Sequence, residues 1–143
     1  ITDFRAYAAE PGADVLRAAS HLTGLSGWLA TNSHASEAVQ AQRAGVDLLA
    51  GFSAAAALRR DYLLALAEGR YYLVLRLIAD QQLEEAGGLT DQTITDFRAY
   101  AAEPGADVLR AASHLTGLSG WLATNGRDAQ AAAARQAAQD LGI

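Results

Sequence analysis

Apolar and polar residues alternate along this chain with the spacing of amphipathic helices. Within 36–68, apolar side chains recur at intervals close to three and four residues, at Val39, Val46, Leu49, Phe52, Ala56 and Leu63. That spacing places them on one face of a helix. Gly69 follows this stretch, and glycine is a common point of interruption. We therefore expect one helix to end there.

The next apolar run, 71–78, fits two structures, because a short apolar run can be a buried strand or part of a helix. Its continuation to residue 85 is rich in helix-forming residues, and no second strand is available for pairing. We predict a helix over 70–86, which Gly87-Gly88 would terminate in the usual C-terminal position.

Residues 91–125 have the pattern of a helical hairpin. One helix is predicted over 91–102, Pro104-Gly105 form the turn, and Pro104 opens the second helix with Asp107 in its first turn. The predicted packing face of the second helix contains Val108, Ala111, Ala112, Leu115, Leu118, Trp121 and Leu122. A last helix, over 127–141, is almost entirely Ala, Gln and Arg, so it either lies on the surface or packs very closely.

The composition supports a helical fold. The chain has 143 residues, with 34 Ala and 20 Leu against five Val and four Ile. Ala and Leu favour helices, whereas the scarce β-branched residues favour strands. The predicted fold class is therefore all-α, a helical bundle of about five helices.

A repeat is the most specific feature of the sequence. Residues 1–32 and 94–125 are identical, letter for letter. Natural repeats diverge at their surface positions, yet here even Arg17 and Arg110 match. We interpret the identity as a recent duplication or as deliberate engineering, and we expect an exactly duplicated helical hairpin.

The two copies differ in what precedes them. Before the second copy, Thr90 is placed to cap a helix, Asp91 to occupy its first turn, and Leu89 with Ile94 to form a hydrophobic staple. The first copy starts at Ile1 without these residues, and Thr2 is the nearest substitute cap. The second copy therefore has the features of the native context.

The junction after the first copy adds a second indication of origin. Ser33-His34-Ala35-Ser36 match the end of a common expression-tag scar once its methionine is removed, although a match of four residues also arises by chance. The predicted organisation is a duplicated hairpin over 1–32, a tag scar over 33–36 and a helical-bundle domain over 37–143.

Charge and residue usage exclude several functions. The net charge of −5 argues against non-specific nucleic-acid binding, and the chain has neither Cys nor Lys. These absences exclude thiol chemistry, Cys-ligated zinc and a P-loop. The longest uncharged stretch, 18–36, contains too many polar residues to span a membrane. We expect a soluble, cytoplasmic protein that binds neither nucleic acid nor membrane.

No motif for catalysis, a cofactor or a metal ion emerges. The small residues around Ser119 resemble a nucleophile elbow only loosely, and we interpret them as a site of close helix packing. His21 and His114 have no carboxylate at helical spacing, and Glu84-Glu85 fit a solvated helix end. We expect no enzyme, no cofactor and no metal site.

One group of side chains could serve a ligand or an interface: Arg59, Arg60, Tyr62, Arg70, Tyr71, Tyr72 and Arg76. Arginine recognises carboxylate or phosphate, and tyrosine adds stacking and a hydroxyl group. The alternative is a half-exposed surface on which the arginines pair with Asp61, Glu68 or Asp80.

Two functions follow from these features. In the first, the bundle is a non-enzymatic interaction module that self-associates as a homo-oligomer, a dimer, through the duplicated hairpin, by domain swapping or by pseudo-two-fold packing. In the second, it is a regulatory domain that binds a small ligand in a pocket lined by the Arg/Tyr cluster.

Overall fold

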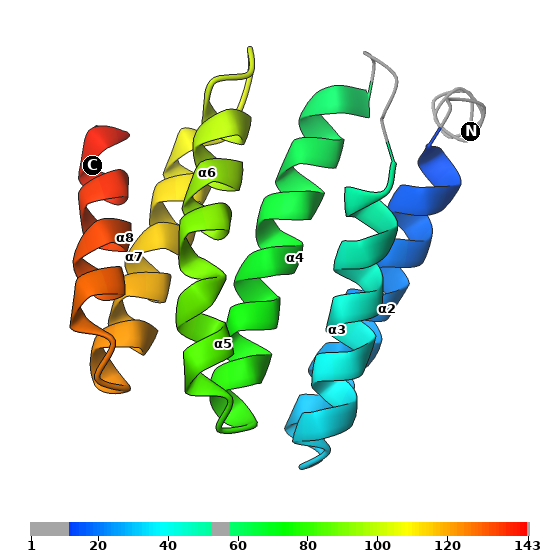
Figure 1. The fold of residues 1–143 in the computed structure, drawn as a ribbon. Helices are drawn as coiled ribbons and strands as arrows, with labels where there is room; N and C mark the ends of the chain where they lie inside the picture. The colour runs from blue at the N-terminus through cyan, green and yellow to red at the C-terminus, as the bar shows by residue number, and fades with distance from the viewer. Residues whose placement is uncertain (1–11, 53–57, 143) are drawn as a thin grey trace.

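The computed structural model describes residues 12–52 and 58–142, and this part of the chain is entirely helical (Figure 1). It contains α2 (Ala13–Thr31), α3 (Ala35–Ala50), α4 (Arg59–Ala79), α5 (Leu83–Gly88), α6 (Thr90–Ala101), α7 (Val108–Thr124) and α8 (Asp128–Asp140). The all-α prediction is confirmed, but the described ranges contain six longer helices and the six-residue α5, where about five helices were predicted. No helix there is long and apolar enough to cross a membrane.

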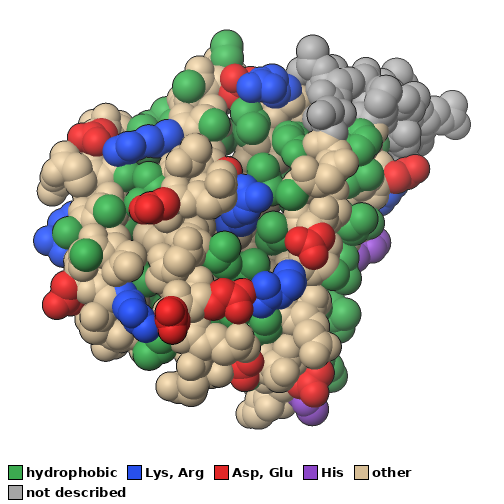
Figure 2. Space-filling view, in the orientation of Figure 1, with side chains coloured by type: hydrophobic (Ala, Val, Ile, Leu, Met, Phe, Trp, Pro, Cys, Tyr) green, Lys and Arg blue, Asp and Glu red, His purple; other side chains and the backbone are tan. Residues whose placement is uncertain are grey.

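The helices lie side by side, with α4 in the middle of the bundle (Figure 1). The α2–α3 hairpin packs on one side of α4, and α6 with the α7–α8 hairpin packs on the other. One core cluster joins α4 to α6, α7 and α8, and a smaller one around Leu16, Leu49 and Leu58 joins α2 and α3 to α4. On the face drawn in Figure 2, acidic, basic and apolar side chains are interspersed.

The predicted helix break at Gly69 is wrong. Gly69 is buried inside α4, and α3 ends at Ala50 with Gly51 as its C-cap. The Gln42 side-chain amide donates a hydrogen bond to the Gly69 carbonyl at 3.1 Å, and a methyl group on Gly69 would lie 3.4 Å from Val46. Glycine is therefore used here for close approach of α3 rather than as a breaker. The helical interpretation of 71–78 is confirmed, but the single helix predicted over 70–86 is wrong: α4 ends at Ala79, Gln81 has a φ of 62°, and α5 begins at Leu83 and includes both Gly87 and Gly88.

The predicted N-cap at Thr90 is also wrong. Helix α5 continues to Gly88, and Leu89 keeps a right-handed helical conformation between α5 and α6. The Leu89 carbonyl accepts the first hydrogen bond of α6, from the Thr93 amide at 3.0 Å, and the Leu89 amide donates back to the Glu85 and Ala86 carbonyls at 3.1 and 3.3 Å. The buried Thr90 hydroxyl donates back to the Ala86 carbonyl at 3.3 Å instead. Asp91 does occupy the first turn of α6.

The turn at Pro104-Gly105 is confirmed, but α7 begins later than predicted. Asp107 is its N-cap, because the Asp107 carboxylate accepts a hydrogen bond from the Arg110 amide at 3.0 Å. The Asp107 amide in turn donates to the Tyr100 hydroxyl at 2.7 Å. These bonds fix the turn that returns the chain from α6 to α7.

The α2–α3 and α7–α8 turns are closed by the same hydrogen bonds. The His34 amide donates to the Leu29 carbonyl and the Arg127 amide to the Leu122 carbonyl, each at 2.8 Å. In the left-handed position of the turn stand Ser33, with φ of 66°, and Gly126, with φ of 75°. The residues predicted to be a tag scar therefore form an ordinary interhelical turn and the start of α3. Residues 1–11 of the predicted first hairpin, which include the substitute cap Thr2, lie outside the described residues.

The alanine-rich face of α8 packs closely against its neighbours. This is one of the two alternatives that the sequence predicted for the last helix. Ala131, Ala134, Ala137 and Ala138 are buried along one face of α8. The Ser119 hydroxyl of α7 donates to the Ala131 carbonyl at 2.8 Å, and Ser26 of α2 donates in the same way to the Ala38 carbonyl of α3 at 3.0 Å. Ser119 thus serves close packing of α7 on α8, as predicted, whereas Gly120 is exposed and has no neighbouring atom within 4 Å of an added methyl group.

Candidate interaction surface

The Arg/Tyr cluster does not converge on one pocket, because its members point to several neighbours of α4. Arg59 pairs with Glu103 at 3.2 Å, and the Arg60 guanidinium donates to the Pro104 carbonyl at 3.3 Å, so both contact the α6–α7 turn. The Tyr62 hydroxyl donates to the Leu49 carbonyl of α3 at 2.5 Å.

The other charged members of the cluster cross-link helices. Arg70 forms a largely buried ion pair with Asp96 of α6 at 2.7 Å. Arg76 lies over the Tyr72 ring, 5.6 Å from its centroid, and donates to the Ser26 hydroxyl of α2 at 3.0 Å. The pairing expected within α4 is therefore wrong for these arginines, since their partners lie on other helices.

Glu68 of α4 is the centre of a polar network with α7. The Arg110 guanidinium binds its two carboxylate oxygens at 2.6 and 3.0 Å, and the His114 imidazole lies 2.7 Å from one of them. Burial alone would raise the pKa of Glu68, but the hydrogen bonds from His114 and Arg110 outweigh it and lower that pKa. This closed network fastens α4 to α7.

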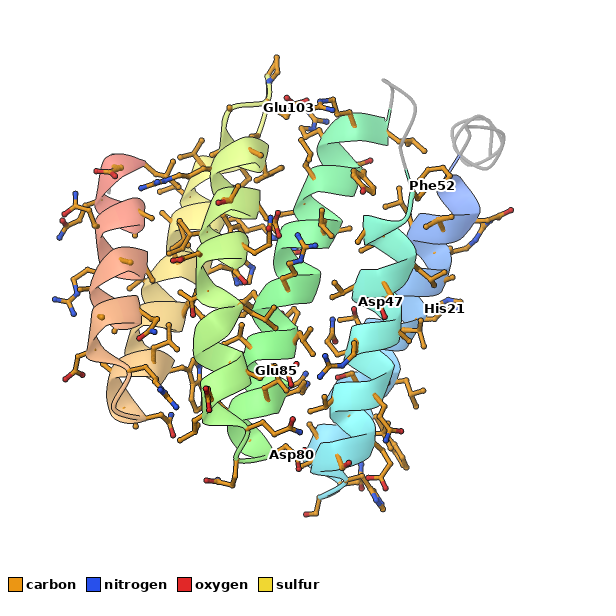
Figure 3. The ribbon with its side chains drawn as sticks, viewed as in Figure 1. His21, Asp47, Phe52, Asp80, Glu85 and Glu103 are labelled. Atoms are coloured by element: carbon orange, nitrogen blue, oxygen red, sulfur yellow. The ribbon has the colours of Figure 1, made fainter. Side chains whose placement is uncertain are left out.

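The two histidines of the repeat have different surroundings. The His114 ring stacks on Phe97 of α6 with centroids 5.4 Å apart and lies 4.5 Å from the centroid of Tyr71, whose phenol pKa is raised by burial. His21 is exposed and points out of the bundle on the side of α2 away from α4 (Figure 3). They do not meet, and no group of potential metal ligands occurs in the part of the chain that the structure describes.

A small cavity of about 140 Å³ lies between α2, α3 and α4. Tyr72 is the only cluster member among its lining residues, which are otherwise mainly apolar or small and include Glu68 at one side. This cavity is therefore not the predicted ligand pocket lined by several Arg and Tyr side chains.

The predicted packing face of the hairpin is divided between core and surface. Leu115, Leu118 and Leu122 are fully buried and Val108 is half-buried. Trp121 is 50% exposed. The indole lies on the outer side of α7, because a helix with apolar residues around much of its circumference cannot bury all of them against its neighbours.

Identical sequences in α2 and α7 bury different flanks. We call Leu16, Thr23 and Gly27, with their equivalents Leu109, Thr116 and Gly120, the α4 flank. In α2 this flank packs on α4: Leu16 is 9% exposed, whereas Leu109 is 69% exposed in α7.

The opposite holds for the second flank. We call Leu22, Leu25 and Leu29, with their equivalents Leu115, Leu118 and Leu122, the α6 flank. In α7 it is buried in the core that contains α6, with Leu118 fully buried. In α2 Leu25 is 47% exposed and Leu22 and Leu29 are partly exposed, and the neighbouring Trp28 is 60% exposed.

Helices α3 and α8 follow the two identical helices and share residues at a spacing of three. The matches are Ala38/Ala131, Ala41/Ala134, Ala44/Ala137, Asp47/Asp140 and Leu48/Leu141. In α8 Asp140 pairs with Arg98 of α6 at 2.9 Å, while in α3 Asp47 is exposed and Leu48 is 41% exposed.

Positions that α3 uses against α4 are not kept in α8. Gln42, Val46 and Leu49 are buried in α3, whereas their equivalents Arg135, Gln139 and Gly142 are exposed. Helix α8 therefore keeps the surface that meets α6 and presents a polar outer side. Ala44, Asp47 and Leu48 were missed in the sequence analysis, although the three-residue spacing of identities beyond residue 125 marks them.

No protein-family model matches this chain, and a search of curated proteins finds no match either.

Proposed function

We propose that this protein is a non-enzymatic helical interaction module that self-associates. The observation that carries the proposal is the open α6 flank of α2. The same sequence in α7 buries that flank completely, so the surface is competent for helix packing and lacks a helix in the described part of one chain.

Large apolar side chains are exposed on both helices of the α2–α3 hairpin. Leu25, Trp28 and Leu48 are 47%, 60% and 41% exposed, and they come from the adjacent helices α2 and α3. Full burial of one such side chain contributes roughly 1.5–3 kcal/mol. Covering the exposed part of Leu25 and Leu48 would therefore contribute about 1–3 kcal/mol. Trp28 is a further exposed aromatic residue, of a type enriched in protein interfaces, but the identical Trp121 stays 50% exposed in α7.

The polar groups of the molecule serve the fold. The Glu68 carboxylate is already bound by Arg110 and His114. Asp96 is occupied by Arg70 and Gln92. Such closed networks support a structural role for the polar groups and favour an interaction module over an enzyme.

Sedimentation velocity over about a hundredfold range of concentration tests the proposal, because self-association depends on mass action. We expect a dimer at high concentration that dissociates on dilution. Leu25→Asp should shift the equilibrium towards monomer, and Leu109→Asp, on the exposed α4 flank of α7, serves as a charge-matched control. A monomer at every concentration contradicts the proposal.

A further inference from the structure

Six residues on the open side of the α2–α3 hairpin are repeated in the α7–α8 surface that packs against α6. We call them the open socket: Leu22, Leu25, Leu29, Ala44, Asp47 and Leu48. Each has an identical residue 93 positions later, on α7, on α8 or, for Leu141, at the C-cap of α8 (residue 1 aligns with residue 94). The hairpin turns are closed by equivalent hydrogen bonds, so the two surfaces are built on the same scaffold.

The equivalent surface on α7 and α8, which we call the filled socket, shows the kind of helix that packs there. Phe97 of α6 is fully buried, stacks on His114 of α7 and also lies beside Tyr71 of α4, with ring centroids 6.4 Å apart. Arg98 of α6 pairs with Asp140 at 2.9 Å. Ile94 and Tyr100 of α6 are buried in the same core. The occupant is an amphipathic helix with an aromatic anchor and an arginine beside it.

The chain carries this occupant twice in sequence. Residues 1–8 read ITDFRAYA, as do residues 94–101, which lie in α6. Resting on the self-association proposed above, we infer that the open socket receives residues 1–8 of a second copy of this chain as an α6-type helix. In a dimer, each copy fills the socket of the other, with Phe4 in the place of Phe97 and Arg5 against Asp47.

The start of α2 favours a second copy as the source. Helix α7 begins at Val108 after the Asp107 cap, whereas α2 begins at Ala13, two residues earlier in the repeat. Asp14 thus lies inside its helix and not at the cap position that closes the α6–α7 turn. Two additional helical residues rotate the direction of chain entry by about 200°. The ring of Phe52 also lies against Gly12, at this end of α2 (Figure 3). The cap hydrogen bond that closes the α6–α7 turn is therefore not repeated at Asp14, which pairs instead with Arg17.

A reciprocal charge exchange tests the inference. Arg5→Asp and Asp47→Arg each place like charges together in a homodimer, whereas a mixture of the two variants pairs opposite charges at both sockets. We expect each variant alone to dimerise more weakly and the mixture to form a heterodimer preferred on the order of tenfold, since two exposed ion pairs contribute about that much. Native mass spectrometry of the mixture, with one variant isotope-labelled, measures the preference. Phe4→Ala should shift the unmixed protein towards monomer, and circular dichroism verifies that each variant is folded.

Each outcome separates this inference from the proposed function. A heterodimer preference in the mixture supports exchange between two copies. A monomer that is unaffected by mixing overturns both the inference and self-association. A dimer that is insensitive to Phe4→Ala and shows no heterodimer preference overturns the inference alone, because self-association then uses another surface such as the α4 flank of α7.

Discussion

The different burial of identical helices can be tested by truncating one leucine in each copy. Leu16 and Leu109 occupy the same position of the repeat, yet Leu16 is 9% exposed and Leu109 is 69% exposed. The local sequence on either side is the same, so the change in helix propensity on replacement by alanine is similar for both. Any difference in stability then reports on tertiary packing.

The expected magnitudes follow from burial. Leu→Ala removes three carbon groups, at about 0.8 kcal/mol each when buried, or about 2.4 kcal/mol before the cost of the cavity. Leu16→Ala should therefore lower the free energy of unfolding by about 2–4 kcal/mol. At Leu109 less than a third of that transfer free energy is available and no cavity forms, so we expect a loss below about 1 kcal/mol.

Urea unfolding, followed by the helical circular-dichroism signal, measures both losses. The comparison is valid where the two variants keep the same dependence on urea concentration, since a changed slope would indicate altered two-state behaviour. Equal losses, or a larger loss at Leu109, would refute the placement of α2 and α7 on different flanks.

Four further substitutions test other features of the structure. Glu68→Gln should lower the free energy of unfolding by about 1–3 kcal/mol at neutral pH. Because folding lowers the pKa of Glu68, the stability that this carboxylate contributes is present above its unfolded pKa and disappears as pH falls through its folded pKa. In a pH series, the variant should therefore lose less stability on acidification than the unmodified protein. Arg70→Ala leaves the Asp96 carboxylate without its ion pair, and urea unfolding should show a loss of about 3 kcal/mol. Gly24→Ala, which meets no atom within 4 Å, should stabilise by about 0.5–1 kcal/mol, whereas the matched Gly117→Ala places a methyl 3.1 Å from a tyrosine hydroxyl and should raise the melting temperature less or lower it.

Local patterns predicted helix existence better than helix ends. Helix α8 spans nearly the predicted residues because it is dominated by strong helix formers, and the ambiguous 71–78 run lies within α4. The roles of Gly69 and Thr90 were assigned wrongly because residue type alone does not show what each residue contacts. A glycine that admits a neighbouring helix looks, in sequence, like one that ends a helix, and a threonine that could cap a helix can instead donate its hydroxyl to a carbonyl of the preceding turn.

The Arg/Tyr cluster shows a related difficulty. Its members are close in sequence, but a helix turns by about 100° per residue. Arg59, Arg70 and Arg76 therefore reach the α6–α7 turn, α6 and α2 respectively. Their partners lie on segments whose positions no local pattern gives.

The amino-acid sequence by itself determined that the repeated segment is helical, since α2 and α7 are both helices in different surroundings. It did not determine which flank is buried. Apolar residues cover more than one side of this helix, so either flank can face a neighbour. Tertiary structure decided that α2 turns Leu16 towards α4 while α7 turns Leu118 into the core with α6. The open socket on α2 and α3 is exposed because no helix of the described chain packs against it, whereas α6 packs against the equivalent surface of α7 and α8.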